Sequence, residues 1–298
     1  MSTLSNTSQS LFLGIDGGGS KCKAIVMNEN NEILGMGISG PGNPLHGFEQ
    51  ATHSITQSAT LALNNAGLAH IQLHDVIAGI GLAGVNMPIL FDKVSAWRHP
   101  FKTMHLTTDL LIACLGAHHG SDGAVIISGT GSCGFCCVNQ QYTVVGGHGF
   151  PQGDKGSGAW FGLQAVEQVL LSLDGLLPTT LMTDALLKKL NCHSDIDLVE
   201  AVANQKATFY AQQASVVFAA AELGDKAALA IINDGAQYIN MMAETLFQKK
   251  PPRLSMIGGL TSRLIPWLAN TLQSRLSPPL NAPEVGAVLY ARQQQARQ

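Results

Sequence analysis

The stretch LFLGIDGGGS at residues 11–20 is a short apolar run that ends in a glycine-rich loop, and AVIISGTGS at residues 124–132 repeats this arrangement. A shift of 112 residues places Asp16 on Ser128 and lays the two loops over each other. Two more strand-like runs follow each loop, with one residue of slippage, at residues 22–27 and 32–35 and at residues 135–138 and 143–146. Each half therefore begins with three short strands. A repeat of this length predicts a duplicated domain, because solenoid repeats run to about 20–50 residues.

Alternating helix and strand patterns fill the remainder of each half. Apolar residues at helical spacing predict a first helix over residues 48–66, with Gly67 at its end. Further strands are expected at residues 76–82, 104–108 and 254–257, and further helices at 109–117, from Ser157 onward, in several segments up to 248, and at 284–292. The sequence thus predicts an α/β fold with a mixed sheet in each half.

Composition excludes several classes of protein. Among 298 residues, 17 are Lys or Arg and 20 are Asp or Glu, which is 12% charged residues where about 25% is usual. The chain is 46% hydrophobic at a net charge of −3, so neither disorder nor nucleic-acid binding is expected. The longest uncharged run, residues 123–153, is broken by Gly, Ser, Thr, Asn and Gln, so no membrane span is expected.

Length and the chain ends favour a two-domain protein of the cytoplasm. Single cores rarely exceed about 250–300 residues, so two domains are expected. Residues 1–10 lack basic and long apolar segments, so we expect a flexible tail and not a signal peptide. A cytoplasmic location follows by default, and the six cysteines are expected to be free thiols.

The glycine loops are suited to binding phosphate. Glycine lets a backbone approach a ligand closely, and the N–H groups of such a loop form a cradle for phosphate oxygens. Two matching loops make this interpretation stronger than a pair of simple turns. Residues 129–134 match GxGxxG literally, but a strand-like run follows instead of the helix that the dinucleotide fingerprint requires.

Three aspartates stand near these loops in an otherwise sparsely charged sequence. Asp109 follows a strand and opens a helix, so it is a candidate N-cap and a candidate general base for a hydroxyl nucleophile, and the two roles do not exclude each other. Asp16 opens the first loop and is suited to bind Mg²⁺ through water. Asp154 lies between glycines before a helix, where it contacts a ligand or belongs to a solvated turn.

The pattern resembles the sugar-kinase branch of the actin, Hsp70 and hexokinase superfamily, in particular the BadF/BadG/BcrA/BcrD ATPase family with its N-acetylglucosamine and glucosamine kinases. The matching motifs occur in family order across nearly the whole chain: DGGGS at 16–20, Asn43 after GPG, Thr108-Asp109, SGTGS at 128–132, GGHG at 146–149, GDKGS at 153–157 and IGG at 257–259.

The resemblance implies a fold and a reaction. The fold is a pair of ribonuclease H-like (actin/hexokinase-type) domains with a cleft between them. The first domain covers residues 1–118, and the second covers 119–298 with a helical insertion and a final helix that packs back on the first. The reaction is phosphorylation of the 6-hydroxyl of N-acetylglucosamine, or alternatively of glucosamine, with ATP and Mg²⁺. The resemblance also suggests a homodimer.

The same resemblance assigns roles to individual residues. Asp109 takes the proton from the sugar hydroxyl, and Asp16 binds the metal. The sugar is held by Asn43, Asp109, Gly147, His148 and Asp154. ATP is bound by Gly17, Gly18, Gly19, Ser20, Lys21, Gly129, Thr130, Gly131, Gly224, Gly258 and Gly259. Among these, Gly224, Gly258 and Gly259 border the adenosine.

Two departures and two rival functions accompany this hypothesis. His148 stands where the family usually has Trp and Lys155 where it usually has Glu, which bears on the identity of the sugar. Cys133, Cys136 and Cys137 leave open a redox activator with an iron–sulfur cluster, a class that the family includes. The other rival is an ATP-binding regulatory module, which would not need both Asp109 and Asp154.

Overall fold

The computed structural model describes residues 10–297, so the expected tail lies outside the described residues except for Ser10. The chain forms two compact units. Unit 1 consists of Met1–Gly123 together with Pro279–Gln298, and unit 2 of Ala124–Pro278. The boundary between the two domains expected from the sequence, residues 1–118 and 119–298, stays a prediction.

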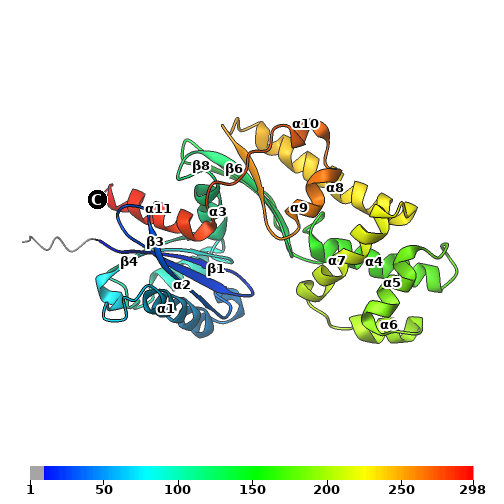
Figure 1. Cartoon of the computed structure of the whole chain (residues 1–298), viewed down its shortest axis with the longest axis horizontal. Coiled ribbons are helices and arrows are strands. Elements are labelled where there is room, and N and C mark those ends of the chain that lie inside the picture. Colours follow the sequence, from blue (N-terminus) through cyan, green and yellow to red (C-terminus); the bar gives the residue numbers. More distant parts are fainter. Residues whose placement is uncertain (1–9, 298) are drawn as a thin grey trace, which may run out of the picture. The chain divides into compact units, whose positions relative to one another are not determined.

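Unit 1 is built on a mixed five-stranded sheet (Figure 1). The strand order is β3-β2-β1-β4-β5, in which β1, β2 and β3 pair antiparallel while β1, β4 and β5 run parallel. The strands are β1 (Phe12–Gly17), β2 (Cys22–Met27), β3 (Ile33–Ser39), β4 (Ile77–Leu82) and β5 (Thr103–Thr108). The three-strand start expected from the sequence is therefore confirmed.

Helices cover both faces of this sheet. The helices are α1 (Phe48–Asn65), α2 (Pro88–Ser95), α3 (Asp109–Ala117) and α11 (Pro283–Gln295). Helix α1 lies so close to β3 that a Cβ atom on Gly35 would come within 2.4 Å of the Ala62 carbonyl oxygen. On the other face, a Cβ atom on Gly14 of β1 would lie 1.9 Å from the Glu284 carbonyl oxygen of α11. Glycine at both positions is what allows the helices to pack this closely.

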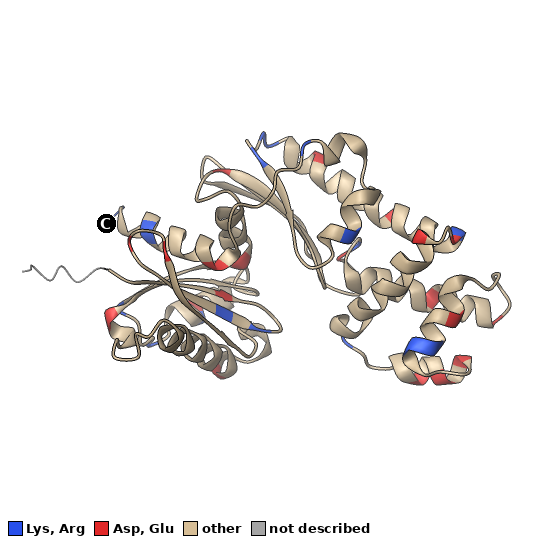
Figure 2. Cartoon of the chain, viewed as in Figure 1, with Lys and Arg blue, Asp and Glu red and all other residues tan. Residues whose placement is uncertain are grey.

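Unit 2 carries a four-stranded sheet and a group of helices. The strand order is β8-β7-β6-β9, and β9 pairs parallel with β6. The elements are β6 (Gly123–Ser128), β7 (Ser132–Val138), β8 (Gln141–Gly146), α4 (Gly158–Leu173), α5 (Leu181–Leu190), α6 (Asp195–Val202), α7 (Ala207–Glu222), α8 (Lys226–Phe247), β9 (Leu254–Ile257), α9 (Thr261–Leu264) and α10 (Asn270–Gln273). Phe161 and Phe218 are fully buried in the core of this unit. Its strands bear no charged residue, whereas charges are frequent on its helices (Figure 2).

The order of strands repeats between the units, as the duplicated sequence predicts. The order β3-β2-β1-β4 corresponds to β8-β7-β6-β9, and β5 is an additional strand of the first sheet. Helix α2 was not expected from the sequence. None of the helices between residues 10 and 297 combines the length and apolarity that a membrane crossing needs.

Candidate active site

The predicted residues of unit 1 lie at the carboxyl ends of its parallel strands. Gly17 of β1, Leu82 of β4 and Thr108 of β5 are neighbours across the sheet. Asp16 and Asp109 therefore stand at the same edge, two strands apart, and neighbouring strands are separated by about 4.8 Å. In open α/β sheets this edge is where ligands bind.

Asp16 carries an unpaired carboxylate. Within residues 10–297 its side chain has neither a hydrogen bond nor an ion pair. Burial raises its pKa to about 7, helped by the negative charges of Asp109 and Glu284, while Lys21 and Lys23 oppose the rise. A divalent cation would relieve this concentration of negative charge, so the site fits Mg²⁺.

Asp109 is not the N-cap of α3. That position belongs to Thr108, whose hydroxyl accepts a hydrogen bond from the Leu111 N–H at 3.2 Å. The capping interpretation of Asp109 is thus wrong, since Thr108 already has the extended backbone of a cap and a suitable hydroxyl. Asp109 Oδ1 accepts from the Leu110 N–H at 2.9 Å, and burial raises the pKa of this carboxyl. The carboxylate is anchored on one oxygen and is not needed to cap the helix.

The first glycine loop is folded against the segment that carries Asn43. The Gly18 N–H donates to the Lys21 carbonyl at 2.9 Å, and the Gly42 N–H donates to the Gly18 carbonyl at 2.9 Å. Ser20 and Lys21 are exposed at the end of the loop. Asn43 thus lies beside the loop of residues 17–19.

Asn43 has one half of its amide engaged. Its Oδ1 accepts from the Leu45 N–H at 2.9 Å, which caps a short 3₁₀ turn at Pro44–His46. A Cβ atom on Gly84 would lie 2.5 Å from the same oxygen, so the segment after β4 lies against Asn43. The amide nitrogen, which carries two N–H donors, remains for a ligand.

In unit 2 the second glycine loop lies beside the predicted adenosine segment. The Leu260 N–H donates to the Ser128 carbonyl at 3.0 Å. Gly258 has φ +108°, and a Cβ atom there would lie 2.3 Å from the same carbonyl oxygen. Gly259 has open space at its Cβ position, and a Cβ on Gly129 would lie 3.9 Å from the Gly259 nitrogen. The second glycine loop and the segment at Gly258 and Gly259 thus lie side by side, and neither has a side chain at its glycine positions.

Two further residues predicted to bind ATP, Thr130 and Gly224, also belong to unit 2. Thr130 is exposed, and its carbonyl accepts from the Ala159 N–H of α4 at 3.2 Å. Gly224 follows α7 in the left-handed conformation, with φ +83° and open space at its Cβ position. Two residues earlier, Glu222 pairs with Arg263 of α9 at 3.3 Å, which ties this end of α7 to the segment after Gly259.

Asp154 reaches back to the second glycine loop. Its Oδ1 accepts from the Gly149 N–H at 3.2 Å, and a Cβ on Gly131 would lie 2.6 Å from its Oδ2. Burial raises its pKa, against hydrogen bonds from Gly149 and Ser132 and the nearby His148. Its φ of +60° lies in the left-handed region. Asp154 is therefore an ordered part of the loop fold and not a solvated turn.

Of the other predicted sugar residues, His148 is exposed and Gly147 has φ +71°. A Cβ on Gly147 would lie 2.8 Å from Cys133 Sγ, so a larger residue would not fit without a shift. The structure thus gathers Gly147, His148 and Asp154 in one loop of unit 2, next to Gly131.

Lys155 points away from this loop. Its Nζ lies 2.7 Å from Asp234 Oδ1 on α8 and 5.4 Å from the centre of the Trp160 ring. Its carbonyl accepts from the Ser132 hydroxyl at 2.8 Å. Two contributors were missed from the sequence, Ser128 and Ser132, which are buried and hold the backbone after Asp154. Their equivalence to Asp16 and Ser20 in the repeat was the available signal.

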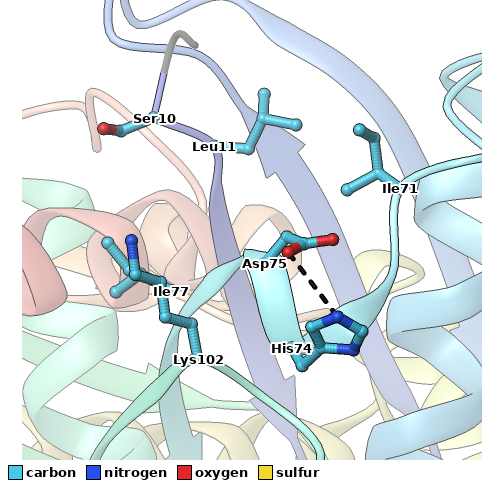
Figure 3. Close-up of a pocket in the computed structure, with 7 residues that line it drawn as sticks. All are labelled: Ser10, Leu11, Ile71, His74, Asp75, Ile77 and Lys102. Atoms are coloured by element: carbon cyan, nitrogen blue, oxygen red, sulfur yellow. Dashed lines mark ion pairs between the residues drawn. The ribbon is translucent and has the colours of Figure 1, made fainter.

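The cysteines and a separate pocket complete the picture. All six cysteines are free thiols, and Cys136 and Cys137 are buried in β7. Within residues 10–297 no three His, Cys, Asp or Glu side chains are grouped so that they could hold a metal ion. A pocket of about 380 Å³ in unit 1 lies at the opposite ends of β1 and β4, near Leu11 and Ile77, and contains none of the predicted site residues (Figure 3).

Comparisons with known proteins find similar sugar kinases. The chain is 35% identical over 283 residues to a glucosamine kinase from Vibrio cholerae, covering 94% of this chain and 95% of the relative. It is 27% identical to an N-acetyl-D-glucosamine kinase from Dictyostelium discoideum, over 81% of each chain. A crystal structure of a putative N-acetylglucosamine kinase from Chromobacterium violaceum matches with a TM-score of 0.89 at 26% identity, covering 95% of this chain and 99% of that chain.

The expected fold, duplicated domains of the actin and hexokinase type, is confirmed by these structural matches. A glucokinase from Streptomyces griseus shares it at a TM-score of 0.55 and 18% identity, covering 95% of this chain and all of that chain. The model of the BadF/BadG/BcrA/BcrD ATPase family matches residues 13–291. The chain, with its two glycine loops and its carboxylates at the strand ends, therefore belongs to the BadF/BadG/BcrA/BcrD ATPase family.

Proposed function

We propose that this protein is an ATP-dependent amino-sugar kinase that transfers the γ-phosphate of ATP to the 6-hydroxyl of the sugar. The observation that carries the proposal is the carboxylate of Asp109. It stands at the carboxyl end of a parallel strand, on the same edge as Asp16, and is not used as a helix cap. The 35% identity to a named glucosamine kinase over nearly the full length of both chains supports it.

Asp109 acts as the general base. Its free oxygen accepts the proton of the sugar 6-hydroxyl. At the same time the hydroxyl oxygen of the sugar forms the new bond to the γ-phosphorus, and the bond between that phosphorus and ADP breaks. The raised pKa of Asp109 suits this role, because a base is most effective when its pKa approaches the working pH. The Leu110 N–H holds the carboxylate in place.

The two glycine loops bind the phosphates of ATP through their N–H groups, with Ser20, Lys21 and Thr130 at their exposed ends. Asp16 would hold the Mg²⁺ ion through water. When bound, the ion neutralises charge on the phosphates and so stabilises the transferred group. Gly224, Gly258 and Gly259 leave room for the adenosine.

Asn43, Gly147, His148 and Asp154 hold the sugar. Asn43 donates a hydrogen bond from its amide nitrogen, and the Asp154 carboxylate accepts hydrogen bonds from sugar hydroxyls. A charge-assisted hydrogen bond of this kind is worth about 1.5–3 kcal/mol, so Asp154 contributes strongly to sugar affinity.

The acceptor is N-acetylglucosamine, as the resemblance implies, or glucosamine. The observation that favours glucosamine is the 35% identity to a glucosamine kinase, against 27% and 26% to relatives named for N-acetylglucosamine. The free amine is a cation when protonated, which a carboxylate such as Asp154 stabilises. An N-acetyl group removes that charge and adds bulk.

A coupled assay of ADP release over glucosamine, N-acetylglucosamine, glucose and N-acetylmannosamine tests the proposal. We expect the highest kcat/KM for glucosamine, a 6-phosphate product by phosphorus NMR, and no turnover by Asp109→Asn. If kcat/KM is highest for N-acetylglucosamine, that sugar and not glucosamine is the preferred acceptor. ADP release that no sugar stimulates would contradict the kinase.

We further propose that two copies form a homodimer. The edge strand β3 supports this, because Leu34, Met36 and Ile38 on one face are 39–53% exposed. An edge strand without charge or proline is an open surface for pairing. Light scattering coupled to gel filtration tests the dimer, and Met36→Lys should yield monomers.

A further inference from the structure

A buried ion pair lies beside the predicted metal ligand. Glu284, in the first turn of α11, has a side chain only 5% exposed and pairs with Lys23 Nζ of β2, whose side chain is 28% exposed. Neither residue belongs to the family motifs from which the site was predicted. Their partnership spans most of the chain length, so no local pattern indicates it.

The geometry places this pair next to Asp16. Lys23 is the cross-strand neighbour of Asp16 in the β1–β2 ladder, so both side chains project from the same face of the sheet. Gly14 projects to that face too, and the Glu284 carbonyl oxygen lies 1.9 Å from where its Cβ would be. The first turn of α11 is thus docked two residues before Asp16, and Glu284 adds to the negative charge that Asp16 experiences.

Lys23 has two carboxylates within its neighbourhood but pairs with only one. Directly opposite residues of an antiparallel pair have Cβ atoms about 4.5–5.5 Å apart, a distance that a lysine side chain spans with ease. Yet within residues 10–297 its ion pair is with Glu284, and Asp16 has none. The ammonium group of Lys23 therefore lies on Glu284 and not on Asp16.

We propose that Glu284 is a positioning residue that holds Lys23 away from Asp16, so that the Asp16 carboxylate stays open to the Mg²⁺ that accompanies ATP. The proposal rests on the proposed function, because it assigns Asp16 to Mg²⁺. Without the Glu284 charge, Lys23 would take Asp16 as its partner. A lysine on Asp16 would compete with the cation for the same oxygens.

The test measures how much Mg²⁺ tightens ADP binding. Isothermal titration calorimetry on the full chain gives the Kd of ADP with and without Mg²⁺, and the ratio of the two reports metal binding. We expect Glu284→Gln to reduce this ratio about tenfold, since an opposite charge at this range shifts such equilibria by a factor of ten or more. Lys23→Met/Glu284→Gln should restore it to within about twofold, because the competing ammonium is gone. Glu244→Gln, an exposed residue of α8, is the matched control and should leave the ratio unchanged.

The outcomes separate a positioning role from a purely structural one. A Glu284→Gln protein with a lower Tm but an unchanged ratio would overturn the proposal, as would a double variant as impaired as the single one. If Glu284→Gln does not fold, Glu284→Asp takes its place. We then expect the ratio of the two ADP Kd values to fall by about threefold, and an unchanged ratio would overturn the proposal. If the wild type phosphorylates amino sugars and Glu284→Gln leaves the ratio of ADP Kd values unchanged, this inference alone is refuted. A wild-type protein without kinase activity and without Mg²⁺-dependent ADP binding refutes the proposed function as well.

Discussion

Loop 16–20 of unit 1 and loop 128–132 of unit 2 follow equivalent strands, β1 and β6, yet their side chains are used differently. Asp16, the residue before the last of β1, has an unpaired carboxylate, and Ser20 is exposed. At the equivalent positions Ser128 and Ser132 are buried, and their hydroxyls donate to the carbonyls of Gly156 and Lys155 at 3.2 and 2.8 Å. One copy of the loop leaves its polar side chains unpaired or exposed, while the other fixes the segment that carries Asp154.

The sheets differ as well, because unit 2 has only an isolated parallel bridge, between Leu254 of β9 and Leu276, where unit 1 has the strand β5. Asp109 directly follows this additional strand. Unit 1 therefore holds both the predicted metal ligand and the predicted base, whereas unit 2 contributes backbone cradles and the loop around Asp154. The division of chemistry between the two copies is what the following variants test.

The largest effect is expected for Asp109→Asn. An amide cannot take the proton of the sugar hydroxyl, so kcat should fall by about 10²–10⁴-fold, the range that general bases contribute. The hydrogen bond from the Leu110 N–H can persist, so ADP affinity by calorimetry should remain within about twofold. A kcat close to that of the wild type would remove Asp109 from the mechanism.

The next effect contrasts equivalent positions of the repeat. Asp16→Asn should weaken Mg²⁺-dependent activity by about 10–100-fold without lowering the free energy of unfolding, because the amide avoids the cost of a buried, unpaired charge. Ser128→Ala should instead lower stability by about 1 kcal/mol, since it removes the hydrogen bond to the Gly156 carbonyl. Steady-state kinetics over Mg²⁺ concentration and urea unfolding of both variants measure the contrast. Equal effects of the two variants on Mg²⁺ dependence would contradict the division of roles.

Asp154 is expected to act on sugar binding. Asp154→Asn should raise the KM for the sugar about tenfold, because the amide tolerates φ +60° but loses the charge. Asp154→Ala should add a stability loss of about 1 kcal/mol, since alanine is disfavoured in the left-handed region. Kinetics and thermal unfolding of the pair separate charge from backbone. An unchanged KM in both variants would show that Asp154 serves the loop only.

Asp16 should also make the stability of the protein depend on pH. Its pKa is about 7 in the folded protein and 3.8 ordinarily, so the folded state binds its proton more tightly than the unfolded chain does. The free energy of unfolding therefore falls as pH rises from about 4 to about 7 and levels off above that. Raised pKa values at Asp109 and Asp154 act in the same direction. Tm measured from pH 5 to 8 should fall less in Asp16→Asn than in the wild type, and parallel curves would contradict the assignment.

Much of this architecture is readable in the sequence because it depends on local patterns. Clustered glycines and short apolar runs indicate both loops and their strands, and the end of a strand-like run indicates Asp109. The sequence leaves open whether Asp109 caps α3, because Thr and Asp are both good caps and only the backbone geometry decides between Thr108 and Asp109. The partners of Glu284 and Lys155 are far away in sequence, so neither ion pair has a local signature.

Lys155 should have the smallest effect, although its place in the GDKGS motif suggested a bearing on the sugar. Its ammonium pairs with Asp234 on α8 and lies over the Trp160 ring, so its charge is directed to the helices and not to the carboxylate of Asp154. A partly exposed ion pair of this kind contributes about 0–1 kcal/mol. Lys155→Ala should therefore lower Tm slightly and leave the KM values for glucosamine and N-acetylglucosamine within about twofold of the wild type. A changed preference between the two sugars would mean that Lys155 leaves Asp234 when the sugar binds. The GDKGS segment would then contribute a positive charge to sugar recognition.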